Sequence, residues 1–147
     1  MPGLRVAYVL LWFPEPSQTF ILDEVNTLRD LGLGVRVYTL YGPRGAGRLA
    51  GLKSPTAPVS HLGLSAWGQV LPDLLNLRRR WGKGAASFLR RVLLRKWRSL
   101  ETAGEALWAA LAGVHLARRL SEAHIDHLHA PWANGPATAA WVASHLS

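Results

Sequence analysis

The pattern that most limits the fold of this chain is a strand, a helix and a second strand within residues 5–40. Arg5–Leu11 is a nearly continuous run of apolar β-formers, typical of a parallel strand covered on both faces. Phe20–Leu31 places apolar residues on one helical face, with Gly32 as a stop, and Val35–Leu40 predicts a second strand. Such a unit is right-handed and begins a doubly wound α/β fold. We therefore expect a Rossmann-like parallel sheet with flanking helices.

Further elements are expected after residue 40, in what we take to be a single domain with a basic helical insertion at about residues 65–120. Thr102 and Glu105 form a capping box, which predicts a helix start. The expected elements are, in chain order, a loop at 41–63, a weak helix at 65–77, a basic helix at 85–98, a helix from 102 to 120, a third strand at Ile125–Ala130 and a helix that starts at Asn134-Gly135-Pro136.

The net charge of +8 comes from one segment. Residues 78–98 hold nine basic residues and no acidic one, whereas the rest of the chain holds eight basic and nine acidic residues. A histone-like or ribosomal protein spreads positive charge over its surface. This local concentration therefore disfavours those classes.

Several other classes of protein lose support from what the sequence lacks. The absence of cysteine excludes disulfide scaffolds, thiol nucleophiles and Cys-based metal sites. The sequence contains neither a P-loop nor a glycine-rich dinucleotide fingerprint, and no apolar run approaches the ~20 residues of a membrane-spanning helix. Val6–Phe13 makes a poor signal peptide. We expect a cytoplasmic protein, with peripheral association at the inner face of the cell membrane left open.

Two loops are the candidate ligand site, because both follow expected parallel strands and lead into helices. In open parallel sheets, ligands bind at the carboxyl ends of the strands, where helix N-termini offer free N–H groups. Hydroxyls, an amide, close backbone approach and flat aromatic surfaces suit a sugar ring or a base there. The alternative is that these residues only cap helices, form turns and fill the core. The candidate residues are Trp12, Ser17 and Thr19 in the first loop and Trp132, Asn134 and Gly135 in the second.

Three histidines surround the third expected strand. Strand alternation would place His127 and His129 on one face, but Asp126 would point to the other face. A metal site needs a further ligand aimed at the same point, so we expect no metal here. His129, near the carboxyl end of the strand, is instead a candidate hydrogen-bonding residue of the ligand site, and His124 is expected to be structural.

The segment 85–98 predicts an amphipathic helix with a basic face. Such a helix, with aromatic residues at its apolar margin, suits a membrane interface that carries anionic lipid. An ordinary surface helix with a solvated basic face is the equal alternative. The candidate membrane-contacting residues are Arg90, Arg91, Arg95, Lys96, Trp97 and Arg98.

Five segments near the two ends of the chain carry a recognisable set of motifs. They are Arg5-Val-Ala-Tyr-Val-Leu, Phe13-Pro-Glu-Pro-Ser-Gln-Thr-Phe-Ile21, Leu28-Arg-Asp-Leu-Gly32, Val35-Arg-Val-Tyr and His127-Leu-His-Ala-Pro-Trp-Ala-Asn-Gly-Pro-Ala137. These segments resemble those of family 4 glycosyltransferases, closest to colanic acid and amylovoran glycosyltransferases of bacterial exopolysaccharide synthesis. The resemblance spans residues 5–137, and its most specific part is Pro-x-Ser-x-Thr-Phe-Ile. Pro131 stands where the family often has a further histidine.

This resemblance implies a GT-B architecture of two Rossmann-like domains and metal-free, retaining transfer from a nucleotide-sugar donor to a lipid-linked saccharide acceptor. In such enzymes the donor-binding glutamates lie in a C-terminal domain. The chain is therefore expected to be an incomplete N-terminal, acceptor-side domain without a C-terminal donor domain. It would hold no catalytic residue and no cofactor of its own, and would transfer no sugar alone.

Two other functions stay open. The basic segment could make the chain a non-enzymatic binder of membrane surfaces or, less favoured, of nucleic acid, with Trp81 and Trp97 as stacking platforms. A small Rossmann-like protein complete in itself would leave an apolar sheet edge after the third strand.

Overall fold

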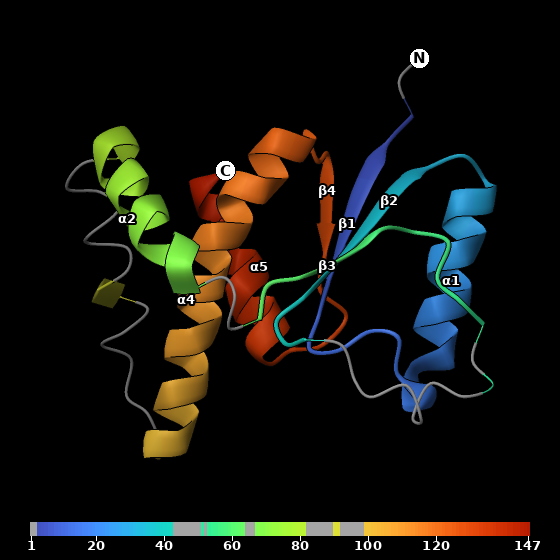
Figure 1. The fold of residues 1–147 in the computed structure, drawn as a ribbon, viewed down its shortest axis with the longest axis horizontal. Coiled ribbons are helices and arrows are strands. Elements are labelled where there is room, and N and C mark those ends of the chain that lie inside the picture. The colour runs from blue at the N-terminus through green and yellow to red at the C-terminus, as the bar shows by residue number, and fades with distance from the viewer. Residues whose placement is uncertain (1–2, 43–50, 52, 64–66, 82–89, 92–98) are drawn as a thin grey trace.

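A computed structural model describes residues 3–42, 51, 53–63, 67–81, 90–91 and 99–147. The described part is an α/β fold with a parallel sheet between two layers of helices (Figure 1). Its elements are, in chain order, β1 (Arg5–Leu10), the short 3-10 helix η1 (Pro16–Gln18), α1 (Thr19–Asp30), β2 (Gly34–Thr39), β3 (Val59–His61), α2 (Trp67–Trp81), α4 (Leu100–Ala123), β4 (His127–His129) and α5 (Gly135–Leu146).

The sheet confirms the expected parallel arrangement. In the described part of the chain its strand order is β3-β2-β1-β4, and every neighbouring pair is parallel. β1 lies in the middle, with Val6 paired to Val35 of β2 on one side and to His127 of β4 on the other. This order, in which β1 has β2 on one side and the later β4 on the other, is consistent with a Rossmann-like fold.

Alternate residues of β1 enter two separate cores. Val6, Tyr8 and Leu10 pack against α1, whereas Ala7 and Val9 pack against α4 and α5. Figure 1 shows the same layers, with α1 on one side of the sheet, α4 and α5 on the other, and α2 outside α4. The nearly unbroken apolar sequence of β1 follows from this burial on both faces.

The prediction of one continuous loop over residues 41–63 was wrong, because β3 lies within it. This strand has only three residues, extends the sheet beside β2 and pairs Thr39 with His61. Val-Ser-His between glycines and prolines has too little β-propensity and too short a pattern to be recognised locally. The strand expected at Ile125–Ala130 is therefore the fourth, and it is shorter than expected.

The helix predicted from Thr102 begins two residues earlier, at Leu100. Ser99 is the N-cap of α4, and its hydroxyl oxygen accepts a hydrogen bond from the Thr102 backbone N–H at 3.2 Å. The predicted capping box was therefore wrong in position, since Ser99 provides the same hydroxyl cap three residues earlier. The prediction for α5 was confirmed, because Asn134 is its N-cap and proline occupies its first turn.

α4 and α5 pack together unusually closely at Gly113. A Cβ atom built on this glycine would lie 2.7 Å from the carbonyl oxygen of Ala139 and 2.8 Å from Cβ of Val142. The two helices therefore approach at a distance that only glycine permits. This contact holds the helical layer against Ala7 and Val9 of β1.

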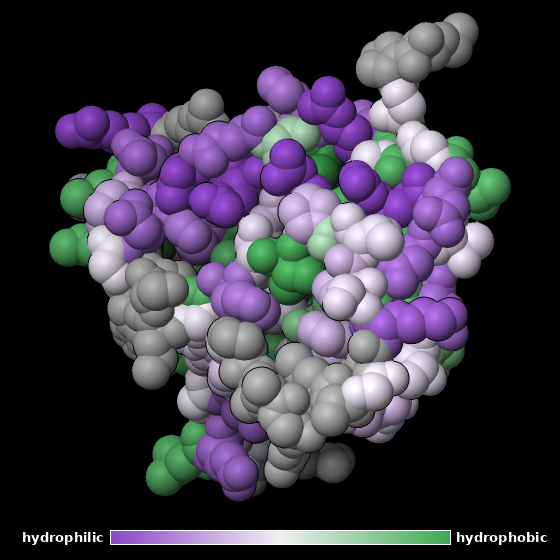
Figure 2. All heavy atoms as spheres, turned by 45° about the vertical axis from the view of Figure 1, so that its right-hand side comes forward, coloured by the Kyte–Doolittle hydropathy of each residue, from purple (hydrophilic) through white to green (hydrophobic). Residues whose placement is uncertain are grey.

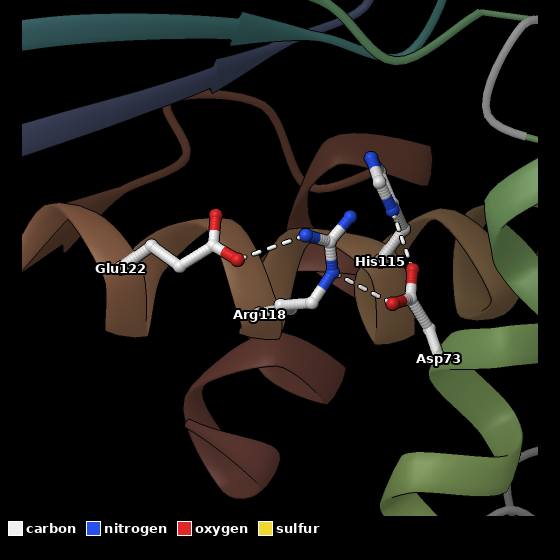
Figure 3. A network of polar contacts seen from close by, with 4 residues as sticks. All are labelled: Asp73, His115, Arg118 and Glu122. Atoms are coloured by element: carbon white, nitrogen blue, oxygen red, sulfur yellow. Dashed lines mark hydrogen bonds and ion pairs between the residues drawn. The ribbon is translucent and has the colours of Figure 1, made fainter.

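A buried polar network attaches α2 to α4 (Figure 3). Asp73 of α2 is 5% exposed, and its two carboxylate oxygens separately accept hydrogen bonds from His115 Nδ1 at 2.6 Å and from Arg118 Nε at 2.7 Å. Arg118 also donates from one terminal nitrogen to Glu122 at 2.8 Å. The helix expected weakly at 65–77 thus extends to Trp81, passes through Pro72 and is held by charge as well as by apolar contacts.

The predicted basic helix lies mostly outside the described residues. Arg90 and Arg91 are helical and exposed, whereas Arg95, Lys96, Trp97 and Arg98 are not among the described residues. Within the described part, no helix has both the length and the apolar character needed to cross a bilayer. The face in Figure 2 mixes hydrophilic and hydrophobic residues, with a small group of hydrophobic atoms near its centre and others scattered toward its edges.

The close approach of α4 and α5 predicts opposite effects of alanine at two glycines of α4. Gly113→Ala should lower the free energy of unfolding by about 1–3 kcal/mol, because the added methyl group meets backbone and Val142. Gly104→Ala is the matched control, since no atom lies within 4 Å of its added Cβ, and it should raise stability by about 0.5–1 kcal/mol. Urea unfolding followed by circular dichroism measures both. Equal stability of the two variants would contradict the packing argument.

Candidate functional site

The candidate site lies at the carboxyl end of the sheet, where β1 and β2 continue to pair beyond their last residues. The backbone N–H of Leu40 donates to the carbonyl of Leu10, and that of Tyr41 donates to Leu11. This extended pairing brings Tyr41 beside Trp12. Their rings stack with centroids 4.8 Å apart and an interplanar angle of 24°.

Both predicted loops contribute to one small pocket of about 150 Å³. Trp12 comes from the loop after β1, and Asn134 and Gly135 come from the start of α5 after β4. Among the residues that the structure describes, the lining consists of Leu11, Trp12, Leu40, Tyr41, Glu105, Trp108, Asn134 and Gly135. Clefts that enclose whole small molecules have volumes of roughly 300–1,000 Å³. This pocket can therefore hold one ring of a ligand, with the rest of the ligand outside it.

The Asn134 side chain at this pocket forms no hydrogen bond with the residues that the structure describes. Asparagine at an N-cap ordinarily accepts a hydrogen bond from the first turn of its helix. Here Asn134 makes no side-chain cap bond, although its backbone carbonyl accepts from Thr138 at 3.2 Å. The side chain is exposed. Its amide is therefore available to both the hydroxyl groups and the carbonyl groups of a ligand.

Two further predicted residues, Trp132 and His129, make aromatic contacts with residues on the α1 side of the sheet. Trp132 is 36% exposed and makes an edge contact with Phe20, with ring centroids 6.2 Å apart. His129 makes a similar contact with Tyr8 at 4.9 Å. The alternative that both predicted tryptophans fill the core is wrong, because Trp12 is half-buried and Trp132 is exposed.

Ser17 and Thr19 are exposed and do not cap α1. Gln18 is the N-cap residue, and it makes no side-chain cap hydrogen bond. The alternative function of these hydroxyls as helix caps is therefore wrong. The structure places both residues in or beside η1, and neither is among the described residues that line the small pocket.

The histidines do not assemble a metal site within the described residues. His127 and His129 lie on one face as expected, with ring centroids 6.5 Å apart, but no third ligand joins them in that part of the chain. His124 ends α4 in the left-handed conformation, with φ of 50°. Asp126 accepts a hydrogen bond from the Arg5 backbone N–H at 2.9 Å, which joins the starts of β4 and β1.

Sequence reasoning missed five of the described residues that line the pocket. Leu11 and Leu40 were assigned to strands, and the other three are Tyr41, Glu105 and Trp108. Tyr41 falls at the first position of a predicted loop, and Glu105 was assigned to a capping box. Trp108 looks like any apolar residue of a buried helix. The spacing of Glu105 and Trp108 on one side of α4 is the only sequence signal that could have paired them.

Burial raises the pKa of each tyrosine in the chain. For Tyr8, a hydrogen bond to Glu24 and the charge of that carboxylate raise the pKa further. For Tyr41, the negative charge of Glu105 adds to the effect of burial. For Tyr38, burial also dominates, although Arg36 and Arg119 partly offset it.

Comparison with known proteins identifies no relative: no family model, no curated protein and no solved structure matches the chain.

The raised pKa values of the three tyrosines predict how the folded protein behaves in alkali. The phenols should remain protonated above their ordinary pKa of 10.0, so ultraviolet absorbance of tyrosinate should appear only at higher pH. Because the unfolded chain releases these protons more readily, stability should fall as pH rises through 10 and beyond. A spectrophotometric titration and unfolding curves across this range measure both effects. A tyrosinate midpoint at pH 10 in folded protein would contradict the burial of these rings.

Proposed function

We propose that this chain forms the acceptor-binding side of a retaining glycosyltransferase that acts on a lipid-linked saccharide. The observation that carries the proposal is the pocket at the carboxyl end of β1. It combines the stacked rings of Trp12 and Tyr41 with the unused amide of Asn134 and the carboxylate of Glu105. The resemblance of the two flanking segments to family 4 glycosyltransferases supports the same assignment.

The chemistry of this pocket suits a sugar. The C–H faces of a pyranose ring are apolar and pack on aromatic rings, while its hydroxyl groups donate to carboxylates and bond to amides. Glu105 is exposed and accepts hydrogen bonds, and Asn134 both donates and accepts. The pocket therefore offers one aromatic platform and two kinds of polar contact to a single ring.

The GT-B architecture belongs to the same proposal. The parallel sheet and the ligand pocket at its carboxyl end are what the first of two Rossmann-like domains would provide. The nucleotide-sugar donor would bind to residues outside this chain, in a second domain. The residues of this chain would hold and orient the acceptor saccharide.

We propose further that the basic segment holds the chain at an anionic membrane surface, where a lipid-linked acceptor resides. Residues 78–98 carry nine basic side chains and no acidic one, and Arg90 and Arg91 are exposed. Each basic residue near anionic lipid contributes about 1 kcal/mol.

Substitutions at the pocket test the saccharide proposal. Trp12→Ala and Asn134→Ala should each weaken binding of methyl glycosides roughly three- to tenfold, because one removes a stacking surface and the other removes hydrogen bonds. Saturation-transfer NMR with a panel of methyl glucoside, galactoside and mannoside measures this binding. Trp141→Ala is the control, since this exposed tryptophan lies on α5 outside the pocket. The proposal fails if no glycoside in the panel binds or if all three variants bind alike.

Charge reversal tests the membrane proposal separately. The double variant Arg90→Glu/Arg91→Glu should reduce cosedimentation with phosphatidylglycerol vesicles by more than about tenfold. Arg29→Glu/Arg36→Glu changes the net charge equally at exposed positions elsewhere and should reduce it much less. Equal loss in both variants would assign the effect to net charge alone. Equal binding of wild type to neutral and anionic vesicles would also contradict the proposal.

A further inference from the structure

A second pocket, of about 390 Å³, lies between the end of β3, α2 and α4. It is distinct from the pocket at Trp12, because the described residues that line the two pockets do not overlap. Among its described lining residues are two arginines and two histidines, but no aspartate or glutamate. The lining consists of Ser60, His61, Leu62, Gln69, His115, Arg118 and Arg119.

The buried Asp73 fixes the orientation of His115 at this pocket. The carboxylate also accepts from Arg118, and an ionised carboxylate can only accept, so Nδ1 of His115 carries the proton in their 2.6 Å hydrogen bond. Nε2 therefore lies at the opposite end of the ring. The His115 side chain is 9% exposed, and within the described residues Nε2 has no hydrogen-bond partner.

Arg118, like His115, uses only some of its nitrogens in hydrogen bonds with the described acidic side chains. Its Nε donates to Asp73 and one terminal nitrogen donates to Glu122. Figure 3 shows its remaining nitrogen on the same side as Nε2 of His115, directed away from the Asp73 carboxylate. Asp73 and Glu122 instead line a neighbouring pocket of about 380 Å³. The guanidinium thus has acids on one side and the basic pocket on the other.

Arg119 adds a second positive charge that the network does not use. It is half-buried, and no ion pair involves it among the residues that the structure describes. A purely structural network that joins α2 to α4 uses Asp73, Nδ1 of His115 and Nε of Arg118, and the bond from Arg118 to Glu122 lies within α4. It does not account for Arg119, for Nε2 of His115 or for the third nitrogen of Arg118.

We propose that this pocket binds a phosphoryl group, held by His115, Arg118 and Arg119. Two guanidinium groups repel cations, and planar N–H pairs match the oxygens of a phosphate. A phosphate monoanion also carries P–O–H groups, so it can donate to an unprotonated Nε2 while it accepts from the arginines. The volume of the pocket leaves room for the rest of a phosphate ester. The phosphoryl group can belong to a soluble ester or to a lipid headgroup.

Two substitutions test this site without removal of the network that supports the fold. Arg119→Gln removes a charge that has no ion pair in the described structure. His115→Asn places an amide N–H where Nδ1–H was, so the hydrogen bond to Asp73 can persist while Nε2 is lost. Arg29→Gln is the matched control, an exposed arginine on α1 across the sheet. Thermal unfolding by circular dichroism verifies that each variant remains folded.

Isothermal titration calorimetry with inorganic phosphate and glycerol phosphate tests the soluble source, and cosedimentation with phosphatidic acid vesicles tests the lipid source. Saturable binding by wild type that weakens at least about tenfold in both Arg119→Gln and His115→Asn, but not in Arg29→Gln, supports the site. The arm in which this occurs identifies the source. Absence of saturable binding in all three arms would overturn the proposal, as would equal effects of the test and control variants.

Discussion

The double-sided burial of β1 is the constraint on which the rest of the structure depends. Its backbone is hydrogen-bonded to β2 on one side and to β4 on the other, and its side chains alternate between two cores. Val6 and Tyr8 require α1 on one face, whereas Ala7 and Val9 require α4 and α5 on the other. Because Ala7 is small, the α4–α5 layer can lie close to the sheet. Gly113, which has no Cβ atom, lets α4 and α5 approach each other closely.

The same arrangement creates the candidate saccharide pocket. Since β1, β2 and β4 are parallel, the segments that follow them emerge at one edge of the sheet. The backbone pairing of Leu10 with Leu40 and of Leu11 with Tyr41 continues into those segments. Trp12 therefore meets Tyr41, and the start of α5 brings Asn134 beside them. The long helix α4 crosses this edge and supplies Glu105 and Trp108.

Charge has two separate functions on α4 and α2. Burial by itself would lower the pKa of Arg118, but hydrogen bonds and the charges of Glu122 and Asp73 outweigh that effect and raise it. Arg118 therefore stays charged while it holds α2 against α4. The basic groups left over, above all Arg119, face the pocket at the end of β3. A structural ion network and a candidate anion site thus share one guanidinium.

The sequence by itself determined β1, α1, β2 and the start of α5, because each has a local sequence signal. β1 and β2 are short runs rich in apolar residues, α1 has an apolar stripe that ends at a glycine, and α5 begins with a proline after an asparagine cap. It also indicated that Trp12 and Asn134 lie at one end of the sheet, since parallel strands end at the same edge. It did not reveal β3, whose three residues depend on pairing with β2. Nor did it reveal the partners of Asp73, because His115 is 42 positions away and no local pattern links them. Only the tertiary structure decided these contacts, since they depend on how the helices cross the sheet and not on the order of neighbouring residues.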